Sequence, residues 1–170
     1  PASDTLKTKH YIPNPMTTLI RPSQASDVRR LTAIYAHHVV HGSGSFELIA
    51  PDENEMVRRR TAVLDNGQPF LVAEVDGAVM GYAYANLFRP RPAYRYLVEN
   101  SVYIDHQAQR LSLGRALMAE LIQRCEAQGA RQMIAVIGDS ANLGSIRLHQ
   151  GLGFEHVGLI RSSGWKHQRW

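Results

Sequence analysis

The most informative part of the chain is the stretch from Glu99 to Gly114, ENSVYIDHQAQRLSLG. An apolar strand pattern runs to Ile104, a polar loop follows, and apolar residues then recur at helical spacing. Free amides at the start of such a helix, and the positive end of its dipole, converge on one point that Arg110 and Arg115 flank. This pattern favours an anion there, above all a pyrophosphate. Taken alone, an ordinary loop-to-helix junction is the simpler interpretation.

The hydrophobic pattern predicts strands and helices on both sides of this stretch. Two runs joined by Asp76-Gly77 predict a β-hairpin, and the apolar run 133–137 is typical of a strand buried on both faces. In chain order, the predicted elements are strand 18–21, helices 27–41 and 52–65, strands 70–75, 78–87 and 96–104, helix 113–129, strand 133–137, helix 142–150 and a strand from Phe154.

This order predicts a single α/β domain of mixed α+β type over residues 17–170. Helices on both faces are expected to cover a central mixed, largely antiparallel sheet. A doubly wound nucleotide fold is excluded, because strands and helices do not alternate and no GxGxxG motif follows the first strand. Residues 1–16 are polar and aperiodic, so they are expected to be a disordered tail or a remnant of expression.

The composition is that of a soluble globular protein, with 44% hydrophobic and 20% charged residues. No apolar run approaches the roughly 20 residues of a membrane helix, which favours a cytoplasmic protein without a membrane partner. The net charge of +4 does not indicate nucleic-acid binding, because the basic residues are scattered and Arg58-Arg59-Arg60 fits a solvated helix face. Cys125, the only cysteine, excludes an internal disulfide and a CxxC metal site, and it is expected to be buried.

Three segments carry a resemblance to a known family. Residues 109–114, QRLSLG, resemble the Q/R-x-x-G-x-G/A motif of the GNAT superfamily of N-acetyltransferases. Residues 142–154, which begin NLGSIRLH and end LGF, resemble that superfamily's last helix and the strand after it, and Ile20-Arg21-Pro22 is similar to its first strand. Together with the order of elements, the resemblance covers nearly all of residues 18–165 and implies the GNAT fold.

A closer resemblance links the chain to the phosphinothricin acetyltransferase branch, through VENSVYI at 98–104, RPRPAY at 89–94 and GWKH at 164–167. That branch acetylates the α-amino group of phosphinothricin, methionine sulfone or methionine sulfoximine. The resemblance therefore implies direct transfer from acetyl-CoA, as co-substrate and without a metal, to a small amino-acid-like molecule. It also implies a homodimer.

Two residues are candidate catalytic groups. Glu99 lies near the centre of a predicted strand, where reduced solvation would raise its pKa and suit it as the general base. The alternative is a structural ion pair with an arginine such as Arg95. His149 occupies the helix position where many members of the superfamily have a tyrosine acid. It is expected to protonate the departing thiolate or help to activate the amine, although a lone histidine can also be a packed residue.

The resemblance also implies two sets of binding residues. A backbone amide of the strand at 102–104 would polarise the thioester carbonyl, and arginines suit recognition of carboxylate or phosphinate oxygens. The residues expected to bind the cofactor are Val102, Tyr103, Ile104, Arg110, Leu111, Ser112, Leu113, Gly114, Arg115 and Asn142. The residues expected to bind the substrate are Phe46, Arg89, Arg91, Tyr94, Asn100 and Ser101.

The chain departs from the family pattern at Ser112, at Gly144 inside the last predicted helix, and at its C-terminal end. Ser112 stands where the motif usually has its first glycine, so a positive φ there would carry a steric cost of about 1 kcal/mol or more. If φ is negative, the hydroxyl is free to donate to a phosphate oxygen. The family also has one more strand, inserted between its last two, and the sequence to Trp170 shows none. The expected reason is truncation, or cover supplied by another chain.

Other functions remain open at this stage. A protein or peptide N-terminal acetyltransferase is the main enzymatic alternative, and it would need an open peptide groove. A module that binds acyl-CoA without turnover is favoured by Ser112 and the missing strand, while Glu99 argues against it. Nucleic-acid binding, suggested by the pI of 9.5 alone, would show a steep dependence of affinity on salt, which is not expected here.

Overall fold

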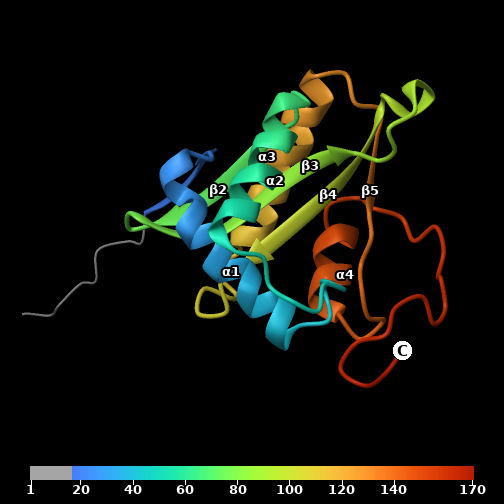
Figure 1. Cartoon of the computed structure of the whole chain (residues 1–170). Helices are drawn as coiled ribbons and strands as arrows, with labels where there is room; N and C mark the ends of the chain where they lie inside the picture. Colours follow the sequence, from blue (N-terminus) through green and yellow to red (C-terminus); the bar gives the residue numbers. More distant parts are fainter. Residues whose placement is uncertain (1–16) are drawn as a thin grey trace, which may run out of the picture.

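The computed structural model describes residues 17–170, so the tail predicted for 1–16 lies outside the described residues. Its centre is a five-stranded sheet in the order β1-β2-β3-β4-β5 (Figure 1). The first three pairings are antiparallel and the last, between β4 and β5, is parallel, so the predicted mixed, largely antiparallel sheet is confirmed. The strands are β1 (Thr18–Pro22), β2 (Phe70–Val75), β3 (Ala78–Leu87), β4 (Leu97–Ile104) and β5 (Gln132–Ala135).

Helices cover both faces of the sheet, as the sequence predicts. One face carries two helices that precede the central strands, and the other carries two that follow them (Figure 1). The helices are α1 (Val28–His41), α2 (Glu53–Asp65), α3 (Leu113–Ala127) and α4 (Leu143–Gln150), with short 3₁₀ turns at Ala25–Asp27 and Pro92–Tyr94.

Each face of the sheet packs its own hydrophobic core, because side chains alternate along the strands. On the α1/α2 side, Phe70 and Tyr82 pack against Leu31 and Ile34. On the α3 side, Ala83, Val98 and Val102 pack against apolar residues of α3, including the buried Cys125. Burial raises the pKa of the Cys125 thiol to about 11, which suits a structural residue.

The hairpin between β2 and β3 turns at Asp76 and Gly77, as predicted. Their φ angles are 49° and 84°, the left-handed values that a type I′ turn requires at both central positions. This turn fixes the register in which Val75 lies opposite Ala78. The register in turn places the tyrosines of β3 on the α1/α2 face.

Strands β4 and β5 separate part-way along β4. Their parallel pairing runs from Leu97↔Gln132 to Asn100↔Ala135 and stops, while β4 continues to Ile104. The Asp105 amide donates to the Met80 carbonyl at 2.8 Å, so along β4 the odd-numbered residues are those hydrogen-bonded to β3. The main-chain groups of Val102 and the amide of Ile104 therefore face the open side, while the Ile104 carbonyl accepts from Nε2 of His38 at 2.8 Å.

Two predictions for the C-terminal part are wrong. No strand begins at Phe154 within the described residues; beyond α4 there is only an isolated bridge between Lys166 and Arg169. Strand β5 is half-buried, not buried on both faces, and Val136 just after it is 66% exposed. One absence explains both: among residues 17–170, no strand lies beyond β5 to hydrogen-bond with either segment.

Within residues 17–170, every helix is too short or too polar to cross a lipid bilayer.

Candidate active site

Glu99 lines a cavity of about 400 Å³ on the α1/α2 face of the sheet. Ser101, two residues further along β4, and Arg89, from the loop after β3, line the same cavity. Burial raises the pKa of the Glu99 carboxyl. Among the described residues, no ion pair involves Glu99, and Arg95 instead lies over the Tyr96 ring at 4.3 Å. The alternative of a structural Glu99–Arg95 pair is therefore wrong.

The structure brings only some of the predicted substrate-binding residues to this cavity. Arg89 lines it, with its guanidinium 5.1 Å from the Phe88 ring centre. Tyr94 packs edge-on against the same ring at 5.7 Å and does not line the cavity, and neither does Arg91, which is exposed. Phe46 lies in the loop after α1 against Gly138 and Gly164, where a Cβ on Gly164 would come within 2.6 Å of it.

Asn100 lies on the opposite face of β4 from Glu99, where it contacts His149. Its side-chain amide donates to the Ile134 carbonyl at 3.0 Å, at the point where β4 and β5 separate. Its Oδ1 is 3.0 Å from Nε2 of His149. The sequence motif groups Asn100 with the substrate site, whereas the alternation of the strand directs its side chain towards α4.

His149 is buried in α4 between several polar atoms. Nδ1 lies 2.8 Å from the Ser145 carbonyl and 3.4 Å from the Ser145 hydroxyl. Burial lowers the pKa of the imidazole, although the Ser145 carbonyl opposes this. In the neutral ring, Nδ1–H donates to the Ser145 carbonyl, which can only accept, and Nε2 lies beside the Asn100 amide. The ring is thereby fixed beside the fork between β4 and β5.

The loop before α3 has the backbone geometry of an anion site. Arg110 and Ser112 have φ angles of 67° and 58°, so two left-handed residues flank Leu111. Such alternation turns successive amides towards one concave point, at the positive end of the α3 dipole. No side chain caps the helix at Ser112, and the first helical bond is that of Ala116, so the amides of residues 113–115 have no helical acceptor. The loop-to-helix junction therefore fits a pyrophosphate.

Because φ at Ser112 is positive, the first of the two alternatives stated for this residue applies, and the serine carries a steric cost. A non-glycine residue in this region carries a strain of about 1 kcal/mol or more. Of the other predicted cofactor residues, Leu113 is buried in the α3 core, Gly114 packs closely against Leu148, and Arg115 donates to the Gly151 carbonyl at 3.1 Å. Asn142 caps α4, where it accepts from the Ser145 amide at 3.2 Å.

The chain matches the model of the acetyltransferase (GNAT) family over residues 32–154. The chain belongs to this family. It is therefore an N-acetyltransferase that depends on acetyl-CoA. It is 49% identical to a phosphinothricin N-acetyltransferase from Alcaligenes faecalis, over 89% of the chain and 77% of that protein. It is 36% identical to an L-methionine sulfoximine/L-methionine sulfone acetyltransferase from Salmonella typhimurium, over 89% and 88% of the two chains.

A solved structure agrees with this assignment. A GNAT superfamily phosphinothricin acetyltransferase from Sinorhizobium meliloti, crystallised in complex with acetyl-CoA, superposes with a TM-score of 0.88 at 48% identity. The alignment covers 91% of this chain and 83% of that one. The predicted family and fold are therefore confirmed.

The structure of this GNAT domain also reveals site residues that the sequence analysis missed. The 400 Å³ cavity with Glu99 is the outer cavity, and a second, inner cavity of about 220 Å³ adjoins it; Asn86 lines both. Arg59 lines the inner cavity and pairs with Glu47 at 2.6 Å. The prediction that residues 58–60 form a solvated face therefore holds only for Arg58, whose side chain is 69% exposed. Helical period could have separated them, because Arg59 lies three residues after the buried Met56.

Proposed function

We propose that the chain transfers the acetyl group of acetyl-CoA directly to the α-amino group of a small amino acid whose side chain ends in a phosphinate, sulfone or sulfoximine. The observation that carries the proposal is the Glu99 carboxyl, which is held without an ion-pair partner in a cavity that also contains Arg89. The cavity lies beside β4, whose main-chain groups beyond Asn100 are not paired with β5.

Glu99 is the general base in this proposal. A free α-amino group has a pKa near 8, so a carboxylate with a raised pKa accepts the ammonium proton more readily than an ordinary one. The amine nitrogen then bonds to the thioester carbon, the C–S bond breaks, and the thiolate leaves. An amide of Val102 or Ile104 on the open side of β4 holds the developing oxyanion.

Residues 110–115 hold the pyrophosphate of acetyl-CoA. Support comes from the two left-handed residues, the unpaired amides at the start of α3 and the positive charges of Arg110 and Arg115. Arg89 holds the substrate carboxylate in the outer cavity, beside Glu99. A cytoplasmic homodimer is also part of the proposal, and sedimentation of the purified chain tests the dimer.

His149 protonates the departing sulfur through Nε2 in this proposal, and Nε2 leaves its contact with Asn100 to do so. Its fixed place beside the fork between β4 and β5 supports this role. Replacing His149 with glutamine is expected to lower kcat by about 10²-fold, the size of one lost proton donor. Single-turnover kinetics with saturating acetyl-CoA measure this. A lower melting temperature with unchanged kcat would instead make the histidine a packing residue.

A thiol-release assay with acetyl-CoA tests the function as a whole. The panel contains phosphinothricin, methionine sulfone, methionine sulfoximine, the common amino acids and short peptides. Turnover of the first three is expected to exceed that of the common amino acids and peptides. Preference for peptides would favour N-terminal acetylation. Tight binding of acetyl-CoA without turnover of any acceptor would favour the non-catalytic module.

A further inference from the structure

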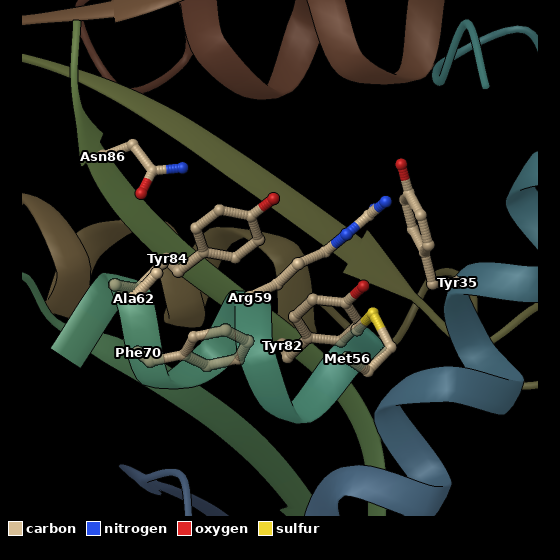
Figure 2. Close-up of a pocket in the computed structure, with 9 residues that line it drawn as sticks. Tyr35, Met56, Arg59, Ala62, Phe70, Tyr82, Tyr84 and Asn86 are labelled. Carbon is tan, nitrogen blue, oxygen red and sulfur yellow. The ribbon is translucent and has the colours of Figure 1, made fainter. Parts of the chain in front are cut away.

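The inner cavity of about 220 Å³ lies between α2 and the α1/α2 face of β2 and β3 (Figure 2). At roughly 30 Å³ per water molecule it has room for about seven waters, enough for a short amino-acid side chain. Met56, Phe70 and Tyr82 give it apolar walls. Asn86 lines this cavity and the outer one with Glu99, so the two cavities are neighbours.

One cation faces this largely apolar space. Arg59 donates through Nη1 and Nη2 to Glu47, at 2.6 and 3.2 Å, and through Nε to Glu55 at 2.8 Å. A guanidinium has five N–H groups, so two remain. Figure 2 shows the guanidinium of Arg59 and the hydroxyl of Tyr84 directed to the same side of the cavity. Burial raises the pKa of the Tyr84 phenol, so it stays a neutral donor.

The charges around Arg59 leave an excess of positive charge. Glu47 and Glu55 are its carboxylate partners, while Arg58 shares Glu55 at 2.7 Å. Lys166, which donates to the Ser45 carbonyl at 2.6 Å, interacts electrostatically with Glu47 from the other side. These five groups carry a net charge of +1, and Arg59 is the one of them that lines the cavity. An anionic group entering the cavity meets net attraction as well as free donors.

We propose that the inner cavity holds the substrate's side chain and that Arg59 determines the preference for a phosphinate or sulfone end. The inference rests on the proposed function. The amine lies at Glu99, the carboxylate at Arg89 in the outer cavity, and the side chain passes Asn86 into the inner one. Its methylene groups contact the apolar walls, and a terminal oxygen accepts from a remaining N–H group of Arg59.

Arg59→Met removes the cation and keeps an unbranched apolar side chain. The KM for phosphinothricin, which is anionic at its end, is expected to rise about tenfold to a hundredfold. The KM for methionine sulfone, which is dipolar, should rise less, and that for methionine should change within about twofold. Steady-state kinetics with the three acceptors at saturating acetyl-CoA measure the ratio.

Glu47→Gln is the matched control, because it breaks the same ion pair and leaves Arg59 in place. The preference for phosphinothricin over methionine is expected to persist or increase in this variant. Equal losses for all three acceptors in Arg59→Met, or the same change of ratio in Glu47→Gln, would overturn the inference and make the pair purely structural. Melting temperatures of both variants report folding. If Arg59→Met does not fold, Arg59→Lys is expected to show a smaller loss in the same order.

Failure of the proposed function can be distinguished from failure of the inference about Arg59. If the wild-type chain acetylates none of the acceptors, the function fails, and calorimetric binding of phosphinothricin in the presence of CoA still tests the cavity. Wild-type binding that Arg59→Met weakens at least tenfold would support the inference. Binding that is unchanged by the substitution, or not detectable in the wild type, would reject it.

Discussion

Replacing Glu99 with glutamine is expected to lower kcat/KM by about 10²- to 10⁴-fold at neutral pH, the range that a positioned general base contributes. The substitution keeps the size and hydrogen-bonding capacity of the side chain and removes its basicity. Affinity for acetyl-CoA should stay unchanged, because the pyrophosphate loop lies beyond the end of β4. Glu120→Gln, on the surface of α3, is the control and should retain full activity.

The pH dependence identifies the titrating group. Burial raises the pKa of Glu99, and the carboxylate form is the base. Wild-type kcat/KM should therefore rise with pH through that raised pKa, at higher pH than an ordinary carboxyl would give, and the variant should lack this rise. A Glu99→Gln enzyme with full kcat/KM at every pH would remove Glu99 from the mechanism.

The stability of Glu99→Gln provides an independent control, because it should change in the opposite direction to activity. A carboxyl whose pKa is raised by folding contributes stability below its unfolded pKa, and this contribution is lost as pH rises through the folded pKa. At neutral pH the ionised Glu99 therefore disfavours the folded state. Glu99→Gln should raise the melting temperature while it lowers activity, which separates loss of the base from misfolding.

Much of the fold could be predicted because its signals are local. The Asp76-Gly77 turn, the leucine spacing of α3 and the polar loop before it each depend on residues close together in sequence. The missing strand at Phe154 shows the limit of such signals. A strand needs a partner for its main-chain groups, and whether one exists is a property of the sheet rather than of the segment.

The candidate site likewise has some features that the local sequence predicts and others that it does not. Period-two alternation places Glu99 and Ser101 on one face and Asn100 on the other, so the separation of Asn100 from the base was available from the sequence. The pairing of Glu47 with Arg59 was not, because it joins a loop to a helix twelve positions away. Nothing in the local pattern around either residue indicates which charges will meet across a cavity.

Replacing Asp105 with alanine is expected to destabilise the chain by about 2–3 kcal/mol and to weaken acetyl-CoA binding about tenfold. Asp105 is buried at the end of β4, where it accepts from Arg30 at 2.5 Å and from the Gln107 amide at 2.8 Å. These bonds fix the first turn of the loop that leads to the left-handed Arg110 and Ser112. A loosened loop must be ordered when the cofactor binds, and that cost reduces affinity.

Thermal unfolding and calorimetric titration with acetyl-CoA measure the two effects. The expected loss of stability corresponds to a melting temperature lower by roughly 4–12 °C. Asp105→Asn, which keeps an acceptor for the Gln107 amide and loses the charge, should fall between the alanine variant and the wild type. Asp65→Ala, at the exposed end of α2, is the control and should change neither quantity.

The dependence on pH distinguishes an ion pair from packing alone. Burial by itself would raise the pKa of Asp105, but the Gln107 amide and Arg30 outweigh it and lower the pKa. A lowered pKa contributes stability above the unfolded carboxyl value, and this is lost as pH falls through the folded value. The difference in stability between wild type and Asp105→Ala should therefore shrink in acid. A difference that is constant with pH would show that the carboxylate charge does not hold the loop.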